Sequence, residues 1–184
     1  MLSWQPENST ALEDLVARYH TPIYRYLFRL TCLHALVEDL TQDCFERLVK
    51  SRSLYQYPRP FRPWLYAIAT NGMRRHFESA YYRPTLLVEQ VESPGVAAAL
   101  DTPHHALELR LGRQEMLDVL AALTPAHRQV IVLRYVEGFA LAEIAVIVQT
   151  PLGTVKTRIV RALDRLRTLL HQRGEPEETS HATA

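Results

Sequence analysis

Cysteine is scarce in this chain of 184 residues, which contains only Cys32 and Cys44. Two cysteines cannot form a disulfide framework, so the composition fits a reducing compartment and a fold held by a hydrophobic core. With His34 nearby, the two thiols leave open a small all-α enzyme or metal-binding sensor, although their spacing matches no common zinc motif. The alternative is that both thiols pack as small apolar groups.

Long hydrophobic runs and catalytic signatures are also missing. No stretch approaches the roughly 18 uninterrupted apolar residues of a membrane-spanning helix, and no basic segment followed by an apolar run opens the chain. We therefore expect a cytoplasmic protein. The sequence has no glycine-rich phosphate loop and no zincin-type histidine pair, since His104 and His105 are adjacent and diverge on a helix. We expect no enzyme activity, metal, cofactor or small-molecule substrate.

Sustained period-two alternation, the pattern of half-buried strands, is absent, so the sequence predicts an all-α protein. Threonine can cap helical amides, and proline at the first helical position loses no needed hydrogen bond. Each Thr-Pro pair is therefore expected to open a helix, at Thr21-Pro22, Thr102-Pro103, Thr124-Pro125 and Thr150-Pro151. The expected helices are about 9–20, 22–33, 35–51, 62–81, 103–122, 125–136, 140–148 and 151–172.

Segments that interrupt the helical spacing divide the chain into two domains. Residues 52–61 combine aromatic residues with two prolines and are expected to form a loop. Residues 84–102 contain prolines and a glycine without helical spacing, which is typical of a flexible linker. We therefore expect helical domains at 10–83 and 103–172, followed by a disordered acidic tail at 174–184.

The formal net charge of +1 conceals an uneven distribution. Residues 51–85 hold six arginines against one glutamate, and residues 150–174 hold six basic residues against one aspartate. Between them, residues 86–125 hold six acids against two arginines. Two basic segments suggest two contacts with a polyanion, although each alone could be an ordinary solvated helix face.

The most informative motif runs from Glu143 to Arg158, where a short apolar helix, a tight turn and a basic helix follow one another. This order is typical of a helix-turn-helix, whose second helix enters the DNA major groove. Apolar residues at 155, 159, 163, 166 and 170 predict an inward stripe on the second helix. The residues left to contact DNA are Thr150, Thr154, Lys156, Thr157, Arg158, Arg161 and Arg165. A generic four-helix unit with a solvated basic face is the alternative.

The residues around this motif resemble region four of bacterial sigma factors. The resemblance rests on Leu123-Thr124-Pro125 with Arg128, Glu143-Ile144-Ala145, and Gly153-Thr154-Val155-Lys156. The short extracytoplasmic-function branch is the closest in pattern. The resemblance implies that this domain grips the minus-thirty-five promoter element and that the chain contacts the β flap of RNA polymerase.

The N-terminal half carries two further resemblances to the same family. Glu38-Asp39-Leu40-Thr41-Gln42-Asp43-Cys44-Phe45 is similar to the part of region two that binds the β′ clamp helices of core RNA polymerase. Helical spacing places four polar residues on one face of this segment. The polymerase-binding residues implied by the resemblance are Asp39, Gln42, Asp43, Phe45 and Glu46.

The stretch from Phe61 to Asn71 resembles the helix with which the family captures the minus-ten element as a single strand. Aromatic side chains can stack on unpaired bases, at roughly 1–3 kcal/mol per base, and arginines can follow the backbone. Trp64 and Phe61 could instead belong to the core. The implied minus-ten residues are Tyr55, Tyr57, Arg59, Phe61, Arg62, Asn71, Arg74 and Arg75.

Four positions depart from the family pattern. Arg75 stands where an aspartate is usual, and Gly72 weakens its helix by roughly 1 kcal/mol relative to alanine. Ala140 replaces a common capping serine or threonine, and Gln149 replaces a usual turn glycine. The last two changes should slightly loosen the first helix of the motif.

The sequence thus predicts a two-domain sigma factor that binds core RNA polymerase and directs promoter-specific initiation. Members of this branch are commonly held by an anti-sigma factor, which makes such a protein a candidate partner. The rival interpretation is a stand-alone helix-turn-helix regulator that binds duplex DNA without polymerase. The polymerase-like and minus-ten-like segments argue against this rival, because a repressor needs neither.

Overall fold

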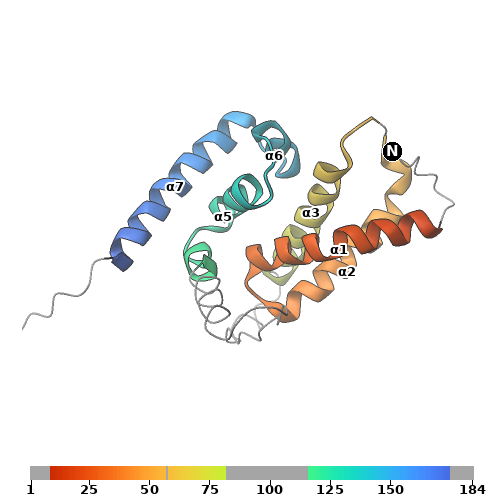
Figure 1. Cartoon of the computed structure of the whole chain (residues 1–184), viewed down its shortest axis with the longest axis horizontal. Coiled ribbons are helices and arrows are strands. Elements are labelled where there is room, and N and C mark those ends of the chain that lie inside the picture. The colour runs from red at the N-terminus through yellow and green to blue at the C-terminus, as the bar shows by residue number, and fades with distance from the viewer. Residues whose placement is uncertain (1–8, 57, 82–115, 175–184) are drawn as a thin grey trace, which may run out of the picture.

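The computed structural model describes residues 9–56, 58–81 and 116–174, and all regular structure in these ranges is helical (Figure 1). This confirms the all-α prediction for the described residues. In the N-terminal half, three helices pack against one another. They are α1 (Ser9–Thr31), α2 (His34–Lys50) and α3 (Phe61–Tyr81), with the short 3-10 helix η1 (Arg52–Leu54) after α2.

The C-terminal half is a second helical group, in which α7 packs against α5 and α6. Figure 1 shows α5 and α6 between the N-terminal helices and α7, which lies outermost. Residues 116–121 are also helical. The remaining elements are α5 (Pro125–Ile131), the π-helical turn η2 (Val132–Val136), α6 (Leu141–Ile147) and α7 (Leu152–Gly174).

The helix break predicted at Thr21-Pro22 is wrong, because α1 continues through Pro22 to Thr31. Proline inside a helix removes one backbone hydrogen bond. The turns that follow compensate by burying Ile23, Tyr26 and Leu27 completely in the hydrophobic core. Tertiary packing therefore outweighs the local stop signal.

The other Thr-Pro pairs in the described chain differ from one another. Thr124 caps α5 as predicted, since its hydroxyl accepts a 3.4 Å hydrogen bond from the His127 amide. Thr150 does not cap α7, because its hydroxyl donates to the carbonyl of Val148 at 3.1 Å. Consequently α7 begins at Leu152, one residue after Pro151.

The predicted apolar stripe of α7 is confirmed only over its first half. Val155 and Ile159 are buried, and Leu163 and Leu166 are partly buried against the same core. Leu170 is 57% exposed, which contradicts its predicted inward position. The reason is geometric, because the last turns of α7 extend away from α5 and α6 (Figure 1).

Several predictions lie outside the described residues. These are the linker at 84–102, the Thr102-Pro103 helix start, His104, His105, Tyr57 and the tail at 175–184. Among the helices that the structure describes, none combines the length and apolar character needed to cross a membrane.

Candidate nucleic-acid interface

The helix-turn-helix is built from α6, a three-residue turn and α7. Ile144 and Ile147 of α6 and Val155 of α7 are fully buried, which fixes the two helices against each other. Ala140 cannot cap α6 with its side chain, but the Glu143 carboxylate accepts the Ala140 amide at 2.8 Å. Half of a capping box is thus retained despite the unusual residue.

The turn itself contains a backbone outlier. Gln149 adopts a φ of +52°, in the left-handed region that usually holds glycine. A residue with a Cβ pays about 1–2 kcal/mol there. Glutamine in place of the usual glycine therefore destabilises the turn, but the turn keeps the geometry of the motif.

The seven residues predicted to contact DNA in this half gather on α7 and the turn before it. Thr154, Lys156, Thr157, Arg161 and Arg165 are exposed, and Thr150 and Arg158 are partly buried. Arg158 lies near the turn, with a guanidinium nitrogen 3.5 Å from the hydroxyl of Thr150. The buried stripe on the opposite side of α7 makes this face available to a duplex.

The aromatic residues before and within α3 form one cluster. The rings of Tyr55 and Trp64 lie 4.9 Å apart, and Phe61 contacts both at 5.7 and 5.8 Å. The Tyr55 hydroxyl donates to the Arg59 carbonyl at 2.6 Å, which shapes the loop between η1 and α3. Trp64 is 9% exposed and is a core residue, whereas Tyr55 and Phe61 are partly exposed.

The basic residues predicted for the minus-ten element differ in availability. Arg59, Arg62, Arg74 and Arg75 are all exposed, but their contacts with the rest of the chain differ. Arg74 contacts Glu78 at 3.7 Å and donates to the Gln149 side chain of the helix-turn-helix at 3.3 Å. The amide oxygen of Asn71 is buried without a hydrogen-bond partner, so it is not presented to solvent in this conformation.

Glu137 was missed by the sequence analysis and is the central polar contact between the two halves. Its side chain is 9% exposed and lies between α1 and α3. The carboxylate contacts Arg29 at 3.3 Å and accepts a 2.6 Å hydrogen bond from the Tyr66 hydroxyl. Arg62 lies 3.6 Å from the same carboxylate and donates to the Glu137 backbone carbonyl at 2.5 Å.

This contact changes the acid-base behaviour of the tyrosine. Burial and the hydrogen bond to Glu137 both raise the pKa of Tyr66, because the phenolate would be poorly solvated and would face a carboxylate. Tyr66 therefore stays a neutral donor. No local pattern in the sequence pairs residues 66 and 137, so this contact could not have been predicted.

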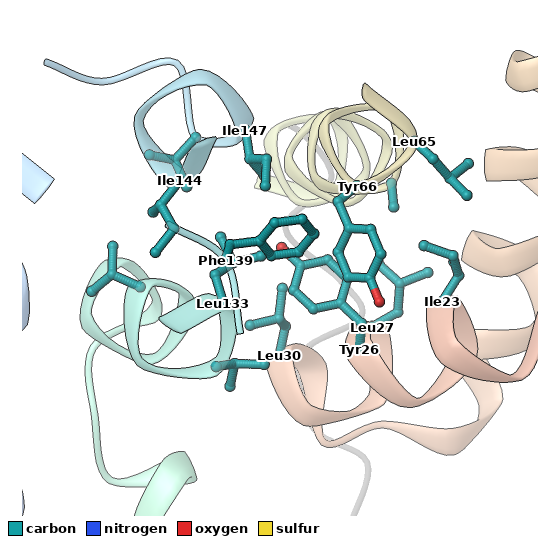
Figure 2. Close-up of a cluster of buried hydrophobic side chains, with 14 of the residues drawn as sticks. Ile23, Tyr26, Leu27, Leu30, Leu65, Tyr66, Leu133, Phe139, Ile144 and Ile147 are labelled. Atoms are coloured by element: carbon teal, nitrogen blue, oxygen red, sulfur yellow. The ribbon is translucent and has the colours of Figure 1, made fainter. Parts of the chain in front are cut away.

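Phe139 is the apolar counterpart of Glu137. Figure 2 shows it reaching from the C-terminal half toward Tyr66 and Tyr26 of the N-terminal half. Phe139 is 1% exposed, its ring meets the edge of Tyr66 at 4.8 Å, and the Arg62 guanidinium lies 4.2 Å above it. Glycine at 138, with a φ of +75°, turns the chain between these two anchors.

Arg128 provides another bridge. Its guanidinium donates to the Leu30 carbonyl at the end of α1 at 2.6 Å and to the Ala121 carbonyl at 2.9 Å. It also lies 3.8 Å from the sulfur of Cys32. The two halves thus share one hydrophobic core and are joined by polar contacts on either side of it.

The polymerase-facing residues predicted on α2 do not all share one face. Asp39, Gln42 and Glu46 are exposed, but Phe45 is buried. Asp43 is partly exposed and pairs with Arg47 at 2.6 Å.

The Asp43 carboxylate also explains a departure from the family pattern. A Cβ at Gly72 would come within 3.2 Å of an oxygen of this carboxylate, which is a tight contact. Glycine therefore allows α3 to approach α2 where the ion pair lies. The lower helix propensity of Gly72 thus accompanies the close packing of α3 against α2.

An open groove of about 630 Å³ lies beside the exposed residues of α2. His20 and Phe45 stack at one side of it, with ring centroids 6.0 Å apart and an angle of 15°. Its lining combines apolar side chains with the acidic Glu38 and Glu46. The groove is lined by Val16, His20, Tyr24, Glu38, Gln42, Phe45, Glu46 and Val49.

The two cysteines lie in different environments. Cys44 is 1% exposed, and burial raises the pKa of its thiol to about 12. Cys32 is partly exposed with a φ of +56°, and burial raises its thiol pKa as well. His34 is engaged by the Tyr24 hydroxyl at 3.3 Å. Within the described ranges, no three His, Cys, Asp or Glu side chains are grouped as metal ligands.

Comparison with known families agrees with this division of the chain. Residues 15–81 match sigma-70 region 2, and residues 119–168 match sigma-70 region 4. The chain is 34% identical to the RNA polymerase sigma factor CarQ of Myxococcus xanthus, over 87% of this chain and 89% of that relative. It is 32% identical to the ECF RNA polymerase sigma factor SigW of Bacillus subtilis, over 85% and 87% of the two chains.

Solved structures have the same fold. CnrH, solved in complex with the cytosolic domain of CnrY, is 27% identical with a TM-score of 0.65, covering 90% of this chain and 91% of that one. The sigma factor RpoE of Bartonella quintana, solved with the anti-sigma factor NepR, has a TM-score of 0.68 at 23% identity. The match covers 88% of this chain and 97% of RpoE, and it supports the fold alone.

Proposed function

Because the chain belongs to the extracytoplasmic-function branch of the sigma-70 RNA polymerase sigma factors, we propose that its two halves divide promoter recognition between them. As a sigma factor it directs transcription initiation. Residues 10–83 bind core RNA polymerase and the minus-ten element, and residues 103–172 bind the minus-thirty-five element. The protein acts in the cytoplasm and needs no catalytic group of its own, because the polymerase performs nucleotidyl transfer.

The observation that carries this proposal is the exposed basic face of α7, the second helix of the helix-turn-helix. Lys156, Arg161 and Arg165 project from this face, and residues at the start of such a helix lie deepest in the major groove. Arginine and lysine read guanine edges or bind phosphates. Thr150, Thr154, Thr157 and Arg158 complete the proposed minus-thirty-five contacts.

The minus-ten surface is proposed on the loop and first turns of α3. The partly exposed rings of Tyr55 and Phe61, together with Tyr57, stack on unpaired bases. Arg59, Arg62, Arg74 and Arg75 follow the backbone, and Asn71 completes the set when it becomes accessible. The buried position of Trp64 favours a structural role that supports the neighbouring rings.

The polymerase surface is proposed on the exposed side of α2 and the adjoining groove. Asp39, Gln42 and Glu46 make this side acidic and polar, which suits a basic partner helix such as one of the β′ clamp helices. Phe45 supports the groove wall from below, and Asp43 orders the helix through Arg47. Region four would contact the β flap.

An anti-sigma factor is proposed as a further partner. This rests on CnrH, a 27% identical relative that was solved in complex with the cytosolic domain of CnrY. Co-purification of a second protein from the native host, identified by mass spectrometry, would test it.

The decisive experiment is co-elution of the purified chain with bacterial core RNA polymerase on gel filtration. We expect near-stoichiometric co-elution and promoter-dependent transcripts from the assembled holoenzyme. A double variant, Asp39→Arg with Glu46→Arg, should bind the polymerase more weakly, while the single charge reversal Asp164→Arg on α7 serves as a control outside this surface. Tight duplex binding without any polymerase association, with an active sigma factor as positive control, would instead identify a stand-alone regulator.

A further inference from the structure

The exposed side of α7 carries one apolar side chain among polar ones. Val160 is 58% exposed, although Ile159 and Ala162 beside it in the sequence are buried in the core. Valine has a lower helix propensity than alanine, and a side chain this exposed adds little to packing. The fold of the chain therefore gives no reason for an apolar residue at this position.

Thr157 extends this apolar spot. It is exposed and lies three residues before Val160, so the two side chains are neighbours on the surface of α7. The Thr157 hydroxyl donates to the Gly153 carbonyl at 3.0 Å. The hydroxyl proton is therefore used within the helix and is not available to a base, whereas the methyl group of Thr157 remains as an apolar neighbour of Val160.

Val160 lies within reach of base edges when α7 enters the major groove. The distance from Leu152, at which α7 begins, to Val160 is about 12 Å along the helix axis. The major groove is also about 12 Å wide. Lys156 lies one turn before Val160 and Arg161 follows it, and both are exposed. These two cations can bind the phosphates that border the groove while the apolar spot meets the bases.

We propose that Val160, together with the methyl group of Thr157, recognises a thymine of the minus-thirty-five element through the C5-methyl group of the base. This proposal rests on the function proposed above for α7 and adds an apolar contact to a set of polar ones. Thymine is the base that presents a methyl group in the major groove, and the position of this group shows which strand carries the thymine. An apolar contact at this point therefore selects one base in one orientation.

Deoxyuridine provides the test, because it pairs with adenine as thymine does but lacks the C5-methyl group. The full chain, assembled with core RNA polymerase, is first used to select promoter duplexes from a library randomised in the minus-thirty-five region. Each thymine of the selected sequence is then replaced by deoxyuridine, one at a time, and the affinity is measured by competition binding. We expect one replacement to weaken binding about fourfold, which corresponds to the loss of one buried methyl group.

Val160→Ser should bind the thymine and deoxyuridine duplexes equally, because serine lacks the methyl groups that contact the base. Serine has a helix propensity similar to that of valine, so α7 should keep its stability. Val146→Ser is the matched control, since Val146 is 49% exposed but lies on α6, and this variant should keep the fourfold difference. Lys156→Ala should weaken binding to both duplexes by the same factor, as a phosphate contact does.

The outcomes separate this proposal from the functional one. A selected sequence without thymine, or one in which no deoxyuridine replacement weakens binding by the wild-type chain, would overturn the methyl contact. A fourfold difference that persists in Val160→Ser would assign the contact to another residue and would equally overturn the proposal. Either result leaves the proposed function of α7 intact. Absence of any sequence preference in the minus-thirty-five region would instead refute that function, and recognition by Val160 with it.

Discussion

The two proposed DNA-binding surfaces of this chain are in opposite states. On α7, Lys156, Arg161 and Arg165 are exposed. On α3, Arg62 and Arg74 are already bonded to the C-terminal half. All of these side chains are exposed, but only the two on α3 share hydrogen bonds with the other half of the chain.

The difference shows that arginines of one chain can lie on a solvent-facing helix or at the contact between its two halves. An arginine on a helix backed by its own core is free to meet DNA. An arginine at the junction of the two halves, such as Arg62, also contacts a carboxylate of the chain itself. Its donors are therefore divided between the packing of the two halves and any outside partner.

The largest effect is expected from Phe139→Ala, which removes the buried ring between the two halves. Its ring is 1% exposed and contacts Tyr66, so we expect a loss of about 3–5 kcal/mol in the free energy of unfolding. Urea denaturation followed by circular dichroism measures it. Because the Arg62 guanidinium lies 4.2 Å over this ring, the change also removes one of the contacts that sets the α3 surface apart from α7.

Phe77 provides the matched control, because it is 37% exposed on the same helix that carries Tyr66. Truncation to alanine at that position should change stability by only about 0.5 kcal/mol. Equal losses in the two variants would mean that Phe139 is no more important than a surface ring.

A smaller effect is expected from Arg158→Ala on the exposed surface. Arg158 lies at the start of α7 beside Thr150, where a bidentate contact to a base is worth about 1–3 kcal/mol of discrimination. Fluorescence anisotropy on cognate and mismatched minus-thirty-five duplexes should show the loss mainly on the cognate sequence. An equal loss on every duplex would make Arg158 a phosphate contact.

Gln149→Gly tests the turn between α6 and α7. The left-handed backbone there costs about 1–2 kcal/mol for a residue with a Cβ. We expect glycine to stabilise the protein by about 1 kcal/mol, since only an exposed 3.3 Å bond with Arg74 is lost. A decrease in thermal stability would show that the left-handed backbone at Gln149 is not strained. The variant should also remove the hydrogen bond that Arg74 donates to the Gln149 side chain.

The smallest effect concerns the two thiols. Burial raises the pKa of Cys44 to about 12, so at pH 8 almost none of this thiol is ionised in the folded protein. Cys32 is partly exposed. We expect a thiol-reactive disulfide reagent to titrate Cys32 slowly and Cys44 only after denaturation. Rapid modification of both thiols in the native protein would indicate that the core around Cys44 opens readily.

Local signals in the sequence were sufficient for most of the fold. The Thr124 cap, the buried side of α6 and the exposed basic residues of α7 follow from short-range patterns, and the structure has all three. The helix break at Pro22 failed because core packing of the following turns outweighs one lost hydrogen bond. Leu170 failed because periodicity cannot show where the supporting helices end.

The candidate sites were predictable only in part, for a physical reason. Residue type and spacing identify which side chains can bind DNA, but they do not show what else those side chains contact. The partners of Arg62 and Tyr66 lie 75 and 71 residues away in sequence, and no local pattern reports contacts at that separation.

The five-residue turn η2 fixes where Glu137 points. Its bonding is wider than that of an α-helix, as the Glu137 amide bonds to the carbonyl of Val132 at 2.9 Å. Such a turn accommodates one more residue than an ordinary helical turn. Deleting one residue from 132–136 would restore regular winding and rotate the following side chain by about 100°. Chain length at this single place would then decide whether the Glu137 side chain still reaches Arg29, Arg62 and Tyr66.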